Sequence, residues 1–272
     1  MSGPARATGD PAAFIRANTR LSAPRLIPEI VLHQADRLLP LWRATEPDLE
    51  ALGLPPPFWA FAWAGGQALA RYVLDHRDFV RGKTVLDLAS GSGLVGIAAM
   101  QAGARAALAA DIDRFAADAA QLNAALNGVT LQTTDADLIG AEAAQEVILV
   151  GDLFYDRDLA PRVFDWLLTL RAAGKSVLIG DPGRTYLPKH KLIQIAAYDI
   201  PVTRALEDAE LKRAAVWELR YPSSPRTARR RAHPGANAHR RRPRSRTEPP
   251  AHPPRPAARP GSQAKARPPS AR

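Results

Sequence analysis

The feature that most constrains the fold is an alternation of short apolar runs and helical segments from Thr84 to Ile179. The expected strands are 84–88, 106–110, 129–133, 146–150 and 176–179, and the expected helices end near Ala102 or cover 114–127 and 159–172. Strands separated by helices pair in parallel, because a crossover needs that length. Two further candidate strands, 191–202 and 214–219, lack room for such a helix, so we expect an antiparallel finish. The pattern predicts a three-layer α/β domain: a seven-stranded, mostly parallel sheet with helices on both faces.

We expect an N-terminal helical extension over residues 1–80, followed by the core over 81–222. After a frayed start at 1–10, Asp10 can cap a short helix over 11–19, since its carboxylate accepts hydrogen bonds from the first backbone N–H groups. Further along come a proline stop, three aromatic residues, a break at Gly65-Gly66 and a helix to about His76.

Composition changes abruptly after position 222. From Ser223 to Arg272, 14 Lys and Arg side chains stand against one acid, Glu248, and the only apolar side chains are alanines. Subtracting these from 37 basic and 27 acidic residues leaves 23 and 26 in positions 1–222, a net charge of −3. A segment without large apolar residues cannot offset its ordering entropy, so we expect residues 223–272 to be a disordered basic Pro/Arg-rich tail.

Several classes of protein are excluded by composition. The chain has no cysteine, which removes disulfides, thiol nucleophiles and Cys-ligated metals. The first ten residues lack the apolar core of a signal peptide, and the longest weakly polar stretch, 93–110, is too poor in large apolar residues to span a bilayer. His33, His76 and His190 have no metal-like spacing, so we expect no metal site. We expect a soluble, cytoplasmic protein without a membrane partner.

A glycine loop follows the first regular strand. Gly91, Gly93 and Gly96 form G-x-G-x-x-G, and Asp111 ends the next strand 20 residues after Gly91. This spacing also fits a dinucleotide site, and a glycine turn without a ligand is a third interpretation. Asp87 favours S-adenosylmethionine, because a carboxylate at that position repels a pyrophosphate and attracts a sulfonium and an α-ammonium group. Asp111 can accept the two ribose hydroxyls.

An aromatic segment precedes Gly65-Gly66. Trp59, Phe61 and Trp63 can form a wall of the donor pocket, with Gly65 allowing close backbone approach. Equally, they can be the apolar face of an N-terminal layer.

An acid and an aromatic pair follow the fourth strand, which is expected to neighbour the first. Asp152 and Tyr155 therefore fall at the rim of the glycine loop, where a carboxylate can attract an ammonium group and accept its proton while aromatic rings desolvate the amine. Alternatively, Asp152, Asp156 and Asp158 are acids that favour the start of the following helix. Asn-Pro-Pro-Tyr, expected for methylating an amide or base nitrogen, is absent.

A turn follows the fifth strand. Asp181 and Arg184 can contact a protein substrate or pair with each other, and we favour the pairing.

These segments carry a family resemblance over roughly 21–219. The chain resembles the seven-strand, class I methyltransferases and, within them, the lysine methyltransferases of the electron transfer flavoprotein β subunit; the matching segments are 28–30, 58–72, 85–93, 111–113, 151–156 and 178–184. The resemblance implies a Rossmann-like sheet, S-adenosylmethionine as donor and a lysine on a folded protein as acceptor. In that family the methylated lysines lie near the surface where the flavoprotein meets its dehydrogenases.

The resemblance also assigns residues. Asp87, Gly91 and Gly93 match the donor-binding loop, Asp111 matches the ribose-binding acid, and Asp152 with Tyr155 matches the acid-x-x-aromatic motif. Ala89 departs from the family, whose loops usually have glycine there.

The tail departs further, because the resemblance stops near Leu219. We favour a frameshift or readthrough product; the alternative is a polybasic arm for acidic partners or nucleic acid. The sequence as a whole predicts a monomeric protein-lysine N-methyltransferase acting on the electron transfer flavoprotein β subunit. Alternative acceptors are a small amine or another protein, such as a ribosomal protein, and a third hypothesis is a nucleic-acid-binding protein acting through its tail.

Overall fold

The structure is a computed structural model that describes residues 10–35, 55–201 and 211–220. All of these belong to one compact unit, Met1–Ser224. The residues outside this description are 1–9, 36–54, 202–210 and 221–272. They include the predicted frayed start, up to residue 9, and the predicted tail over 223–272. Among the described helices, none combines the length and the apolar character needed to cross a membrane.

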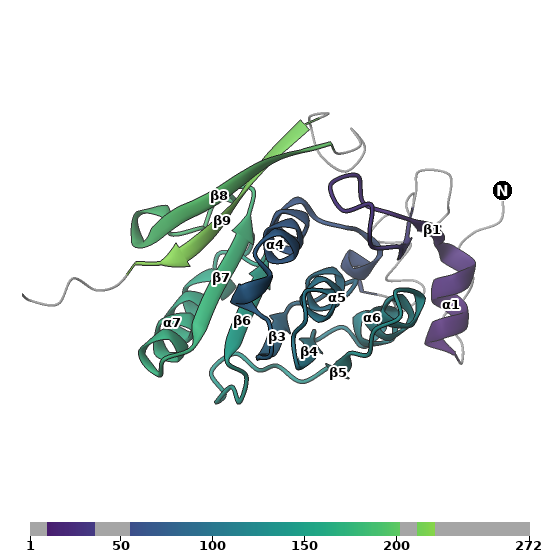
Figure 1. Ribbon diagram of the computed structural model, residues 1–272, viewed down its shortest axis with the longest axis horizontal. Helices are drawn as coiled ribbons and strands as arrows, with labels where there is room; N and C mark the ends of the chain where they lie inside the picture. Colours follow the sequence, from purple (N-terminus) through teal and green to yellow (C-terminus); the bar gives the residue numbers. More distant parts are fainter. Residues whose placement is uncertain (1–9, 36–54, 202–210, 221–272) are drawn as a thin grey trace, which may run out of the picture. The chain divides into compact units, whose positions relative to one another are not determined.

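A seven-stranded sheet in the order β5-β4-β3-β6-β7-β9-β8 forms the centre of the fold (Figure 1). The first five strands along this order are parallel; they are β3 (Thr84–Leu88), β4 (Ala106–Ala110), β5 (Gln132–Thr134), β6 (Val147–Gly151) and β7 (Ser176–Asp181). β9 (Leu211–Leu219) pairs antiparallel with both β7 and β8 (Leu192–Pro201). The predicted sheet and its antiparallel finish are confirmed.

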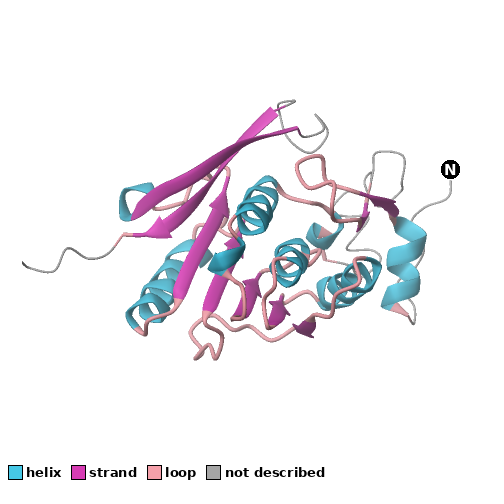
Figure 2. Cartoon of the chain, viewed as in Figure 1, coloured by secondary structure: helices cyan, strands magenta, loops and turns pink. Residues whose placement is uncertain are grey.

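Helices cover both faces of the sheet, as predicted (Figure 2). One face packs against α4 (Ala64–Asp75), α5 (Leu94–Gln101) and α6 (Arg114–Leu126), and the other against α7 (Leu159–Ala172). The strands alternate accordingly: Val147 and Leu149 join the first core, whereas Ile148 and Val150 join the second. A continuous apolar run thus buries both of its faces.

In the described residues of the predicted N-terminal helical extension, a small sheet lies between the helices. α1 (Pro11–Asn18) forms as predicted, with the Asp10 side chain accepting from Ala12 N–H at 2.9 Å. It is followed by a two-stranded antiparallel sheet of β1 (Arg20–Ser22) and β2 (Leu32–Gln34) and by a 3₁₀ turn, η1 (Phe58–Ala60). Short 3₁₀ turns also occur at η2 (Arg77–Phe79) and η3 (Lys189–Lys191).

Several strand boundaries differ from the prediction by one to three residues, and the start of β5 is among those that differ most. β5 begins at Gln132 rather than at the predicted 129. The reason is that Val129 N–H donates to the carbonyl oxygen of Ala124, at the end of α6, and so still belongs to the helix end.

Gly65 and Gly66 do not break the chain, because both lie in the first turn of α4. Gly65 packs directly on the backbone of Gly180 in β7, and a Cβ on either glycine would collide with the other. A Cβ on Gly66 would meet only Val95, at 4.0 Å. The first glycine is therefore required by the contact between α4 and the sheet, and the second is not.

Gly65→Ala should lower the free energy of unfolding by about 1–3 kcal/mol, because the added methyl group forces backbone apart. Gly66→Ala is the matched control and should leave it unchanged or raise it by up to about 1 kcal/mol, the gain in helix propensity. Urea unfolding measures both; equal losses in the two variants would contradict the packing argument.

Asp87 joins β3 to α5 from inside the protein. Its side chain is 1% exposed, and its Oδ2 accepts a hydrogen bond from Gly96 N–H at 2.8 Å. Burial raises the pKa of Asp87 to about 7, and the nearby charge of Asp111 adds to the rise. In the unfolded chain this carboxyl titrates near 3.8. The folded state therefore binds the proton more tightly, and this group destabilises the fold as pH rises through 7.

Asp87→Asn should therefore be more stable than the wild type at about pH 8.5, by up to roughly 4 kcal/mol at 1.4 kcal/mol per pKa unit. The amide oxygen can still accept from Gly96 N–H and carries no charge to bury. The difference should shrink as pH falls toward 4. Urea unfolding across this pH range measures it, and parallel stability curves would show that Asp87 does not titrate in this way.

Candidate active site

A cavity of about 880 Å³ opens at the carboxyl ends of the parallel strands. Its walls come from the loops after β3, β4, β5 and β6, from the segment before α4 and from the turn after β7. Open parallel sheets bind their ligands at this edge. Six predicted site residues line it together: Trp59, Trp63, Gly91, Asp111, Asp152 and Tyr155.

Each parallel strand carries an acid at its carboxyl end. In strand order along the chain these are Asp87, Asp111, Asp135, Asp152 and Asp181. Five aspartates, among them Asp111, Asp135 and Asp152, and three arginines line the cavity, so the acids outnumber the bases and the surface favours a cationic ligand. Sequence reasoning missed Asp135, although its position directly after a strand is the signal that singled out Asp111 and Asp152.

Asp111 is positioned by two backbone groups. Its Oδ2 accepts from Gly91 N–H at 2.9 Å, and its Oδ1 accepts from Asp113 N–H at 3.0 Å. Burial raises the pKa of Asp111. Each carboxylate oxygen has two lone pairs, so each can accept one more hydrogen bond from the cavity side. Asp111 can therefore hold two adjacent hydroxyl groups.

Three predicted donor-site residues lie behind the cavity wall rather than in it. Asp87 faces α5, and Gly65 faces β7. Gly93, at φ +76°, is the N-cap of α5, where a Cβ would lie 2.8 Å from Ala120 Cβ. These residues shape the loop and the helix starts. Ala89, which does line the cavity, has φ +52°, a left-handed conformation that explains why glycine is favoured there.

The aromatic segment before α4 fits both interpretations made from the sequence, a wall of the pocket and an apolar face of the N-terminal layer. Trp59 lines the cavity and is also buried, with its ring stacked at 6.4 Å on Phe115. Trp63 Nε1 donates to the carbonyl oxygen of Phe58 at 3.0 Å, and Phe58 lies 6.1 Å from the Tyr155 ring. Phe58, Trp63 and Tyr155 thus form an aromatic surface on the side of the cavity that holds Asp152.

Backbone conformation and backbone hydrogen bonds fix the position of Asp152. It adopts φ +55°, rare for a residue with a side chain, and its N–H donates to Gly180 O at 2.9 Å. Its Oδ2 accepts from Gly66 N–H at 2.9 Å, at the start of α4. It makes no hydrogen bond to the start of α7. The N-cap there is Asp158, and the side chain that accepts from the N–H groups of Asp158 and Leu159 is that of Asp156. The helix-start interpretation thus applies to Asp156.

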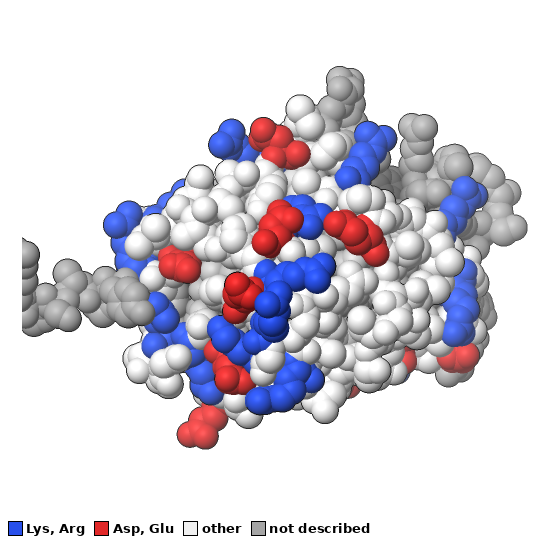
Figure 3. Space-filling model, in the orientation of Figure 1, with Lys and Arg blue, Asp and Glu red and all other residues white. Residues whose placement is uncertain are grey.

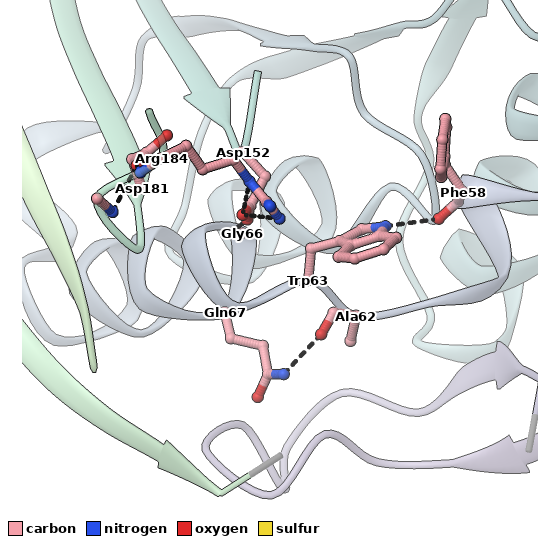
Figure 4. Close-up of polar contacts among 9 residues, drawn as sticks. Phe58, Ala62, Trp63, Gly66, Gln67, Asp152, Asp181 and Arg184 are labelled. Atoms are coloured by element: carbon pink, nitrogen blue, oxygen red, sulfur yellow. Dashed lines mark hydrogen bonds and ion pairs between the residues drawn. The ribbon is translucent and has the colours of Figure 1, made fainter. Parts of the chain in front are cut away.

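Arg184 is the partner of Asp152 (Figure 4). Its Nη2 and Nε donate to Asp152 Oδ1 at 3.0 and 3.2 Å, and its guanidinium lies 5.6 Å from the Trp63 ring centroid. Toward Asp181, the partner favoured from the sequence, Arg184 donates its backbone N–H to Oδ1, and its charge lowers the pKa of that carboxyl against the larger effect of burial. Burial raises the pKa of Asp152 to about 6 even though the guanidinium opposes the rise. The Asp152–Arg184 pair could not be read from the sequence, since it joins two loops 32 residues apart.

Comparisons with known proteins found relatives of this chain. The family model of the ribosomal protein L11 methyltransferase (PrmA) matches residues 67–151, which include the glycine loop and Asp111. Among solved structures, the ribosomal protein L11 methylase of Lactobacillus delbrueckii subsp. bulgaricus is 22% identical, covering 57% of this chain and 80% of that chain with a TM-score of 0.41.

Two curated relatives cover more of the chain. The electron transfer flavoprotein beta subunit lysine methyltransferase of Xenopus laevis is 39% identical over 216 residues, 77% of this chain and 87% of the relative. The protein of the same name from Homo sapiens is 38% identical over 216 residues, 75% of this chain and 80% of the relative. The resemblance seen in the sequence is confirmed. The chain is a methyltransferase and belongs to the electron transfer flavoprotein beta subunit lysine methyltransferase family.

Proposed function

We propose that this protein transfers methyl groups from S-adenosylmethionine to a lysine of the electron transfer flavoprotein β subunit. The observation that carries the proposal is one cavity with two carboxylates in different roles. Asp111 has hydrogen-bonding capacity left for hydroxyl groups, and Asp152 lies beside an aromatic surface.

The donor end of the cavity fits S-adenosylmethionine. Asp111 would accept the ribose hydroxyls, and the acidic rim, including Asp135, suits a cationic ligand rather than a pyrophosphate. The volume of about 880 Å³ is large enough for this donor and a lysine side chain. When bound, S-adenosylmethionine supplies an electrophilic methyl group.

The acceptor end suits a lysine. An ammonium group has no lone pair, so a lysine must lose a proton before it can accept a methyl group. Asp152 would attract the ammonium, orient it and accept its proton, which is feasible because burial raises the pKa of this carboxyl to about 6. Phe58, Trp63 and Tyr155 would exclude water and favour the neutral amine.

The identity of the acceptor rests on the names of the relatives, which are lysine methyltransferases of the flavoprotein β subunit. The folded part does not favour binding of nucleic acid. Basic and acidic side chains are mixed on the face drawn in Figure 3. Basic side chains also have acidic partners: Arg71, for example, pairs with both Glu29 and Asp75 at 2.7 Å. The cytoplasmic location and the monomeric state stay predictions from the sequence.

Incubating the protein with labelled S-adenosylmethionine and purified flavoprotein β subunit should label that subunit. Intact mass should then rise by multiples of one methyl group. In a parallel incubation a cell extract is added, so that other proteins compete with the purified subunit for the methyl group. Labelling of a different protein would change the acceptor, and donor binding without any labelled protein would indicate a small-amine substrate.

Asp111→Asn and Asp152→Asn should affect different properties of the enzyme, donor binding and methyl transfer. The first should weaken donor binding by about tenfold or more, since an amide offers one acceptor oxygen in place of two. The second should keep donor affinity within about threefold and lower kcat by about 100-fold or more. Calorimetry measures binding and initial rates measure transfer.

Asp156→Asn is the matched control for the second variant, because Asp156 lies four residues away, accepts from Leu159 N–H at the start of α7 and does not line the cavity. It should transfer methyl groups at the wild-type rate. An Asp152→Asn enzyme that turns over normally would remove the proposed acceptor role.

A further inference from the structure

The carboxylate of Asp152 already uses most of its hydrogen-bond acceptor positions. Its Oδ1 accepts two hydrogen bonds from Arg184, and its Oδ2 accepts one from Gly66 N–H. A carboxylate has about four lone-pair positions, so roughly one is left. The guanidinium also neutralises the charge that an incoming ammonium would seek. In this arrangement Asp152 can offer a lysine about one hydrogen bond and no uncompensated charge, which is less than the proposed function requires.

Arg184 is not needed to orient Asp152. The backbone turn at φ +55°, the hydrogen bond from Asp152 N–H to Gly180 O and the hydrogen bond from Gly66 N–H already set the position of the carboxylate. These groups belong to β6, β7 and α4 and do not involve the guanidinium. The guanidinium therefore contributes charge at this place rather than geometry.

The guanidinium has the surroundings expected for a substrate cation. It lies between a carboxylate and the face of Trp63, 5.6 Å from the ring centroid, and both groups also bind a lysine ammonium. Its side chain is 23% exposed, and Arg184 lines the cavity.

The backbone beneath it is anchored, because Asp181 Oδ1 accepts from the N–H groups of Gly183 and Arg184 at 2.6 and 2.7 Å. The side chain can therefore leave the carboxylate by rotation alone while the turn stays in place.

We propose that Arg184 occupies the acceptor-lysine subsite of the substrate-free enzyme and that the substrate lysine displaces it from Asp152. This proposal rests on the proposed function. Arg184 then acts as an internal competitor: it keeps the buried carboxylate paired when no substrate is present, and it admits only a cation that can replace it.

Arg184→Ala tests the proposal in the full-length protein. At about pH 8.5, above the pKa of about 6 that Asp152 has beside Arg184, KM for the flavoprotein β subunit should fall by about 3- to 10-fold while kcat stays within about twofold. Arg105→Ala is the matched control, because Arg105 forms an ion pair with Glu146, at 3.2 Å, at the opposite rim of the sheet. It should leave both constants unchanged.

Methylguanidinium provides a second readout. Added to Arg184→Ala at millimolar concentration, it should refill the subsite and inhibit competitively with the protein substrate, and it should affect the wild type much less. If Arg184 instead positions Asp152, the variant should lose kcat and methylguanidinium should restore it; that result, or an unchanged KM, would overturn the proposal.

Failure of the proposed function gives a different pattern. A wild-type enzyme that binds S-adenosylmethionine and leaves the flavoprotein subunit unlabelled would contradict the proposed acceptor, and the role of Arg184 would fall with it. A wild-type enzyme that labels the subunit, with an Arg184→Ala variant that shows no gain in substrate affinity, would contradict the role of Arg184 alone.

Discussion

The close backbone approach between the start of α4 and the ends of β6 and β7 is the constraint on which the acceptor side depends. Gly65 contacts the backbone of Gly180, and a Cβ on Gly151 would lie 3.1 Å from Gly66 Cα. Only this spacing lets Gly66 N–H reach Asp152 Oδ2. Because the contact joins a helix to two strands, it places the aromatic segment before α4 over the same edge of the sheet.

The carboxylates at this edge show how burial and partners separate otherwise similar groups. Asp111 accepts two backbone N–H groups and keeps lone pairs for the cavity. Asp152 is 8% exposed and has a guanidinium partner, yet burial still raises its pKa to about 6. Asp87 is more deeply buried and has its pKa raised to about 7. The first is suited to binding hydroxyls, the second to handling a proton, and the third to holding α5 against β3.

Sequence reasoning located the strands, the rim and two of the carboxylates that line the cavity, Asp111 and Asp152, but not Asp135. It placed Asp87, Gly93 and Gly65 in the donor site, although they lie behind its wall. Proximity along the chain to Gly91 could not tell these positions apart, because the direction of a side chain depends on the strand face and on the packing of α4 and α5. Arg184 was singled out, but with Asp181 as its expected partner, since neighbours in sequence are the only partners that a sequence displays.

The sequence by itself determined the α/β class, the parallel direction of the first five strands and the edge at which the acids gather, because period and crossover length depend on local composition. It also determined which loop carries the glycines. Only the tertiary structure decided which acid faces the cavity and which faces a helix. It alone brought Arg184 to Asp152, because that pairing requires β6 and β7 to lie side by side with Gly151 opposite Gly180, so that the loops after both strands meet.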